Sequence, residues 1–163
     1  MRVATGDDAA AVSRLLERSY GELMAGHYPA SLLASALPFI TKANPALLES
    51  GRYALVEDDD GALLAAGGWS SERPGSREVE PGLAHIRHFA VHPAKVGRGL
   101  GRRLYEWCAN AARDRAFTRF ECHSSLNAEA FYAALGFWRV GERPIALAPH
   151  VVIPAIVMTK VIR

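Results

Sequence analysis

The sequence predicts an α/β protein in which one mixed sheet is covered by helices on both faces. Apolar runs of strand length and amphipathic stretches of helical length alternate in the second half of the chain. The first half holds a hairpin signal, the Asp60-Gly61 step between two apolar runs. No linker or repeat interrupts the pattern, so we expect residues 1–163 to form a single domain.

Composition limits the classes of protein to consider. The chain is 50% hydrophobic and 22% charged, as in ordinary globular proteins. Its formal net charge of +2 is too small to favour nucleic-acid binding by bulk attraction, although several arginines lie along one predicted helix. The first residues lead straight into a polar stretch, so we do not expect a signal peptide, and no apolar run approaches the ~20 residues that span a bilayer. We expect a cytoplasmic protein without a nucleic-acid or membrane partner. The sequence leaves open whether the protein forms a homodimer.

In the first half, the elements are predicted from helical periodicity and from the hairpin. Pro38 is expected to disturb the end of the second helix. Polar residues 70–81 contain prolines and a glycine, so they predict a loop. The predicted order is strand, helix, helix, strand and strand: residues 1–4, 7–20, 30–37, 52–57 and 62–67.

In the second half, strands and helices alternate. Leu100, Leu104 and Cys108 recur at helical spacing, and Gly136 stands where a short helix would stop. Cys108 and Cys122 lack the short spacing of a zinc site and are expected to be buried. The predicted order is strand, helix, strand, helix, strand and strand: residues 83–91, 99–115, 117–123, 127–135, 137–141 and 151–162.

The most informative segment is a glycine-rich turn between a strand and a helix. It reads Val96-Gly97-Arg98-Gly99-Leu100-Gly101-Arg102. Glycines let a backbone approach a ligand, and amides at a helix start favour an anion such as a phosphate. A P-loop is excluded because Arg102 and Arg103 follow Gly101, and a dinucleotide fingerprint is weak because Arg102 replaces its third glycine.

Two motifs resemble those of the GNAT acetyltransferases. Val91-His92-Pro93, three further residues and then Gly97 to Gly101 are similar to the loop with which that family binds the coenzyme A pyrophosphate. Val96 departs from the Gln or Arg that is usual there. The second motif, slightly tighter than the family's, is Asn127, Ala130, Phe131, Tyr132, Leu135, Gly136 and Phe137. The resemblance is clear over residues 83–137 and implies a mostly antiparallel mixed sheet of about six or seven strands.

The resemblance also implies an activity. Such a protein transfers an acetyl group from acetyl-CoA, its co-substrate, to the amine of a small molecule or peptide by direct attack. Tyr132 would be the acid for the departing thiolate, and the backbone of Phe89, Ala90 and Val91 would bind the pantetheine arm and the oxyanion. Further coenzyme contacts would come from Val96, Gly97, Arg98, Gly99, Leu100, Gly101, Arg102, Asn127 and Phe131.

The base that would deprotonate the amine is less well determined. Strand alternation places His85 and Arg87 on the face of Phe89 and Val91, which makes His85 a candidate, but a bulge would change this phase. Glu121, His123 or a water molecule are the alternatives. We expect no metal site, because His85 and His88 would point to opposite faces.

The acceptor pocket is predicted only from the resemblance. In this fold the first two helices and the loop after the third strand usually line it. They offer Tyr20, Met24, His27, Tyr28 and Trp69. An alternative function also stays open, a protein that binds acyl-CoA without turnover. It is supported by the missing carboxylate in residues 83–91 and by the departure at Val96.

Overall fold

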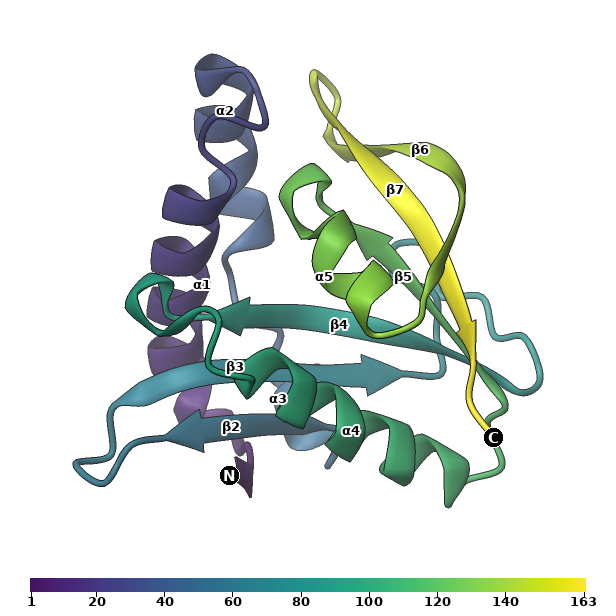
Figure 1. Ribbon diagram of the computed structural model, residues 1–163. Helices are drawn as coiled ribbons and strands as arrows, with labels where there is room; N and C mark the ends of the chain where they lie inside the picture. The colour runs from purple at the N-terminus through teal and green to yellow at the C-terminus, as the bar shows by residue number, and fades with distance from the viewer.

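Seven strands form one sheet in the computed structural model, which describes residues 1–163 (Figure 1). Their order is β1-β2-β3-β4-β5-β7-β6. Every neighbouring pair is antiparallel except β4 and β5, so the predicted mixed sheet is confirmed. The strands are β1 (Arg2–Val3), β2 (Tyr53–Glu57), β3 (Leu63–Ser70), β4 (Leu83–Val91), β5 (Arg119–Ser124), β6 (Trp138–Ala148) and β7 (Val151–Val161).

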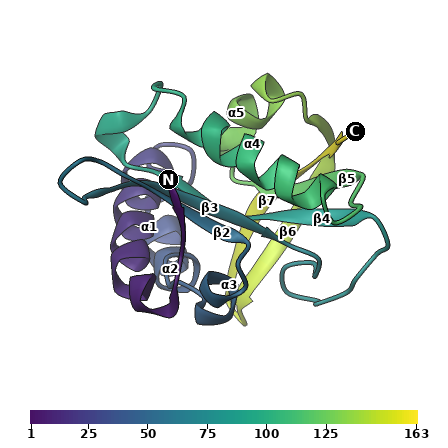
Figure 2. The ribbon, with the colours of Figure 1, turned by 90° about the horizontal axis from the view of Figure 1, so that it is seen from below.

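Helices cover both faces of this sheet, as predicted. One face carries the first three helices and the other carries the last two (Figure 2). Cys108 and Cys122 are buried between the sheet and the second group. None of the helices has the length and apolarity needed to cross a membrane. The helices are α1 (Ala9–Leu23), α2 (Ala30–Ile40), α3 (Pro45–Glu49), α4 (Leu100–Arg113) and α5 (Glu129–Ala134).

Three elements differ from the prediction, each for a local reason. Helix α2 continues through Pro38, which lies in its last turn and interrupts little of the remaining helix. The unpredicted α3 is capped by Asn44, whose side chain accepts hydrogen bonds from two backbone amides of the helix. Strand β6 extends past residue 141 and includes Pro144, which a sheet tolerates here because β6 is an edge strand.

A bulge in β4 overturns the simple alternation expected for that strand. Ala66 pairs with Ala90 but Gly68 pairs with Arg87, so two residues of β4 stand opposite Gly67 alone. His88, one of the two, has the left-handed φ of 47°. Gly67 is required there, because any Cβ on it would overlap the ring of Phe89.

The bulge places β4 side chains differently from the prediction. Phe89 and Val91 pack with Leu104 of α4, whereas Ala90 packs with the side chains of α1. His85 and Arg87 therefore lie on the face opposite Phe89 and Val91, and the expectation that all four share a face was wrong.

The sheet splits between β4 and β5. The two strands pair only through Leu83, Ala84 and His85 of β4. Beyond His85, β4 continues for six residues without a strand partner on that side. Two cavities open at this split, and they hold most of the predicted site residues.

Candidate functional site

The first cavity, which we call the glycine-loop cavity, has a volume of about 600 Å³. It lies between the end of β4, the start of α4 and helix α5. Nearly all of the predicted coenzyme contacts line it: Phe89, Ala90, Val91, Val96, Gly97, Gly99, Leu100, Gly101, Arg102, Asn127 and Phe131. Arg98 is exposed and is not part of the lining.

The three glycines of the loop are needed for two different reasons. Gly97 and Gly99 both have φ of 77°, a left-handed conformation that side chains disfavour. Gly99 also precedes the first residue of α4, so the free amides of the first turn of that helix lie beside the cavity. Gly101 has ordinary φ, but a Cβ there would press on the ring of Phe131. This arrangement fits an anionic group at the helix start.

Asn127 and Arg102 complete the walls of the cavity. The Asn127 side-chain oxygen is buried and has no hydrogen-bond partner in the chain, so it can accept one from a ligand. Arg102 donates a hydrogen bond of 3.2 Å to the carbonyl oxygen of Ala134. This bond joins α4 to the end of α5 beside the cavity.

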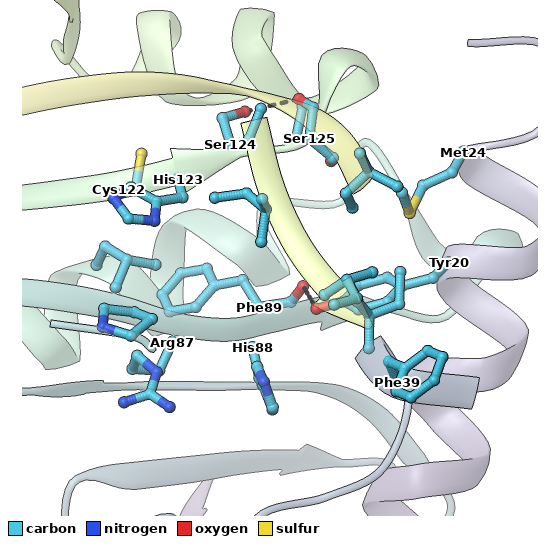
Figure 3. A pocket seen from close by; sticks show the side chains of 18 of the residues that line it. Tyr20, Met24, Phe39, Arg87, His88, Phe89, Cys122, His123, Ser124 and Ser125 are labelled. Carbon is cyan, nitrogen blue, oxygen red and sulfur yellow. Dashed lines mark hydrogen bonds between the residues drawn. The ribbon is translucent and has the colours of Figure 1, made fainter. Parts of the chain in front are cut away.

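The second cavity, which we call the Arg87 cavity, has a volume of about 470 Å³. Arg87 and His88 from β4 lie on one side of it, and His123, Ser124 and Ser125 lie on the other (Figure 3). Apolar side chains from α1, α2, β6 and β7 line most of the rest: Met24, Phe39, Ile40, Ile145, Leu147 and Ile153.

The two cavities meet at a small group of shared residues. Tyr20, Phe89, Ser125, Ala128 and Tyr132 line both of them. A molecule in one cavity can therefore reach a molecule in the other at this junction.

Tyr132 lies at the junction with a free hydroxyl. Tyr132 is 7% exposed. The tyrosine hydroxyls that form hydrogen bonds within the chain are those of Tyr20, Tyr28 and Tyr53, so the hydroxyl of Tyr132 has no partner. Edge contacts with Phe131 and Phe137, at ring centroid distances of 5.0 and 5.5 Å, fix the ring. Burial raises the pKa of Tyr132 well above its ordinary value, so the phenol stays protonated at neutral pH.

Two tyrosines hold the bulge of β4 in place. The hydroxyl of Tyr53 donates to the carbonyl oxygen of His88 at 2.8 Å. The hydroxyl of Tyr20 donates to the carbonyl oxygen of Phe89 at 3.1 Å (Figure 3). With these carbonyl groups bonded on the α1 side, the backbone of the bulge is fixed at the junction.

A carboxylate lies next to the Arg87 cavity, on β5 and not on β4. Glu121 Oε1 is 3.3 Å from His123 Nε2, 3.8 Å from His85 Nδ1 and 3.9 Å from Arg73 Nε. Burial lowers the pKa of His123, and the charge of Glu121 opposes this shift. His123 lines the cavity, so an imidazole backed by a carboxylate faces its interior.

His85 has the same carboxylate neighbour but a different position. It is 1% exposed and lines neither cavity. Burial lowers the pKa of His85 to about 4. Of the two histidines beside Glu121, only His123, one of the alternatives to His85, therefore faces the Arg87 cavity.

The acceptor residues expected from the resemblance are only partly brought together. Tyr20, Met24 and Tyr28 line the Arg87 cavity, but His27 lines the glycine-loop cavity. Trp69 lies in the core against Phe117 and Phe120 and lines neither cavity. The second helix and the loop after the third strand do line this cavity, as expected, but through Phe39, Ile40, Pro74 and Gly75. The residues from β6 and β7 were not predicted, because their place depends on how distant elements pack.

The known proteins that resemble this chain in sequence or structure, reported below, are all acetyltransferases. The model of the acetyltransferase (GNAT) family matches residues 13–137. A GCN5-related N-acetyltransferase structure from Rhodopseudomonas palustris is 22% identical, with a TM-score of 0.74 over 99% of this chain and 98% of that one. A phosphinothricin acetyltransferase from Sinorhizobium meliloti, in complex with AcCoA, is 19% identical, with a TM-score of 0.67 over 99% and 86% of the two chains.

A third structure shows the same fold at lower identity. The PaiA N-acetyltransferase from Thermoplasma acidophilum, in complex with coenzyme A, is 12% identical, with a TM-score of 0.66 over 98% of this chain and 96% of that one. Similarity at these identities establishes the fold, and the family match covers most of the chain. The chain belongs to the acetyltransferase (GNAT) family.

Proposed function

We propose that this protein is an N-acetyltransferase that moves the acetyl group of acetyl-CoA directly to an amine. The observation that carries the proposal is the junction of the two cavities at Phe89 and Tyr132. One cavity has the anion-binding features of a coenzyme site, and the other is a separate pocket for the acceptor. Neighbouring structures that hold coenzyme A or AcCoA support the first assignment.

Acetyl-CoA binding uses the features of the glycine-loop cavity. The amides at the start of α4 bind the pyrophosphate, and Asn127 accepts a hydrogen bond from the coenzyme. The pantetheine arm runs along the unpaired side of β4 beyond His85, where backbone groups have no strand partner. This route delivers the thioester to the junction, where backbone amides of Phe89 to Val91 stabilise the oxyanion.

The acceptor amine must lose a proton before it attacks, since an ammonium group has no free electron pair. His123 receives this proton, and Glu121 stabilises the resulting imidazolium at 3.3 Å. The pKa of His123, lowered by burial, keeps the imidazole neutral at physiological pH and ready to accept a proton.

The reaction then forms a C–N bond and breaks the C–S bond. The amine nitrogen attacks the thioester carbonyl, loses its second proton to solvent, and the sulfur leaves as a thiolate. Tyr132 gives its proton to this thiolate, and the tyrosinate is reprotonated from solvent. The products are the amide and free coenzyme A.

Calorimetric titration with acetyl-CoA, and separately with NAD and ATP, tests the first part of the proposal. We expect acetyl-CoA alone to bind, followed by thiol release when a suitable amine is added. Absence of acetyl-CoA binding would overturn the assignment of the glycine-loop cavity. Tight binding without thiol release, across a broad set of amines, would instead favour a protein that senses acyl-CoA.

A further inference from the structure

Arg87 is a cation without an acidic partner, and it lines the Arg87 cavity. Its Nη1 donates one hydrogen bond of 2.9 Å to the hydroxyl of Ser70. No carboxylate oxygen lies within 4.0 Å of its nitrogens, although other arginines of the chain, such as Arg2, Arg119 and Arg139, form such pairs. A guanidinium has five N–H donors, so most of those of Arg87 are free for a ligand.

The charged or chargeable nitrogen groups that line the cavity are all basic, and the carboxylate of Glu121 lies behind His123 without being part of the lining. No Asp or Glu is part of the lining. Besides Arg87, the only titratable bases there are His88 and His123. Burial lowers the pKa of His88 to about 4, which leaves it neutral near pH 7. The nearest acidic influence on Arg87 comes from Glu72, which acts at a distance and is not itself in the lining.

An unpaired, half-buried guanidinium is unfavourable in a free protein and favours an anionic ligand. The opposite side of the cavity holds His123, which would receive the proton of the acceptor amine. The apolar remainder of the lining, including Met24, Phe39 and Ile153, fits a hydrocarbon body. A ligand that satisfies all three regions has an amine, an acid group and an apolar side chain.

We propose that the acceptor is an amine that also bears a carboxylate or a similar single acid group, an apolar amino acid or amino-acid analogue, whose acid group pairs with Arg87. This inference rests on the proposed acetyl transfer, and it names the acceptor class. The same observations argue against polyamines, because no carboxylate in the cavity would neutralise a second ammonium group.

Matched ligands test the pairing. Leucine and methionine are compared with their amides, with the corresponding amines that lack the carboxylate, and with spermidine. Phosphinic-acid analogues of the amino acids distinguish a carboxylate from another acid group. Binding to the protein saturated with coenzyme A is measured by calorimetry, which requires no turnover, and kcat/KM is measured by thiol release with acetyl-CoA.

The variants are Arg87→Gln, Arg87→Lys and, as a control, Arg18→Gln. Arg18 lies on the exposed side of α1, so its loss removes the same charge away from the cavity. We expect the acids to be preferred over their amides by about tenfold or more in the unaltered protein and in the control. Arg87→Gln brings this ratio near one, and Arg87→Lys keeps part of it. Thermal melting checks that the variants fold.

The outcomes separate the two proposals. Equal use of acids and amides, or a preference for spermidine, overturns the pairing with Arg87 and leaves acetyl transfer intact. A preference for acids that Arg87→Gln leaves unchanged in a folded protein also overturns it. If acetyl-CoA does not bind, the proposed function fails, and selective binding of acids to the free protein still decides the role of Arg87.

Discussion

The hydroxyl of Tyr20 on α1 lies 3.1 Å from the carbonyl oxygen of Phe89, within the bulge of β4. Both residues line both cavities. The bond therefore connects the helix that covers one face of the sheet to the strand segment where the two cavities meet. Because the bulge determines which backbone amides face the junction, this bond links the packing of α1 to the geometry of the site.

Tyr20→Phe removes the bond and keeps the ring. We expect the free energy of unfolding to fall by about 1 kcal/mol, the usual net value of such a hydrogen bond. Urea unfolding measures this change. The matched control is Tyr105→Phe, because the buried Tyr105 hydroxyl has no partner and its loss costs nothing in hydrogen bonding. Equal effects of the two substitutions would show that the bond to Phe89 contributes nothing.

Tyr132→Phe is expected to lower turnover more than coenzyme binding, since it removes a proton donor without removing the ring. A decrease in kcat of about 10²–10⁴-fold would match the loss of a general acid. Steady-state thiol release gives kcat, and calorimetry gives the Kd for acetyl-CoA, which should stay within a few-fold. Turnover equal to that of the unaltered protein would remove Tyr132 from the acid role.

The pH profile should report His123. Its imidazole must be neutral to accept a proton, and burial lowers its pKa, so activity should rise with pH through an apparent pKa below the ordinary 6.5. The charge of Glu121 raises this pKa, and Glu121→Gln should therefore lower kcat/KM and move the acidic limb to still lower pH.

The control for this profile is Glu106→Gln, on the exposed face of α4. It removes the same charge far from the site and should leave the limb where it was. A limb that did not move in Glu121→Gln would mean that another group controls the protonation of the acceptor.

Acidification should destabilise the protein because of His85. Its pKa falls to about 4 in the folded chain, so between pH 6.5 and 4 the unfolded chain binds more protons than the folded one. The stability present above pH 6.5 is lost progressively as the pH falls to 4, by an amount on the order of 3 kcal/mol. Urea unfolding at pH 7, 5.5 and 4.5 measures this slope.

Substitution His85→Asn should flatten the slope of stability against pH, whereas His150→Gln should not. His150 is exposed in the turn between β6 and β7, so the control removes a histidine outside the core. An identical slope in the unaltered protein and in folded His85→Asn would show that other groups control the acid response.

Gly99→Glu should abolish acetyl-CoA binding. The residue would have to keep a φ of 77°, and its carboxylate would repel the pyrophosphate at the start of α4. Calorimetric titration measures the loss. Gly141→Glu is the control, because a side chain added there meets no atom within 4 Å on the edge strand β6. Normal binding by Gly99→Glu would place the pyrophosphate elsewhere.

The sequence by itself determined the fold class, the glycine loop and the position of Tyr132. These features are local, because strand alternation, helical spacing and the glycines of a turn depend on neighbours along the chain. The strand predicted at residues 83–91 has the same bounds as β4. Gly136, predicted to stop a short helix, follows α5 with a left-handed φ of 89°.

Only the tertiary structure decided the face on which His85 lies and the partner of Glu121. The bulge at His88 depends on Gly67 of another strand and on hydroxyls from α1 and β2, and no spacing within residues 83–91 encodes them. The Arg87 cavity likewise gathers side chains from elements far apart in the sequence. Its charge balance, and so the acceptor class that we infer, follows from long-range packing that local patterns do not contain.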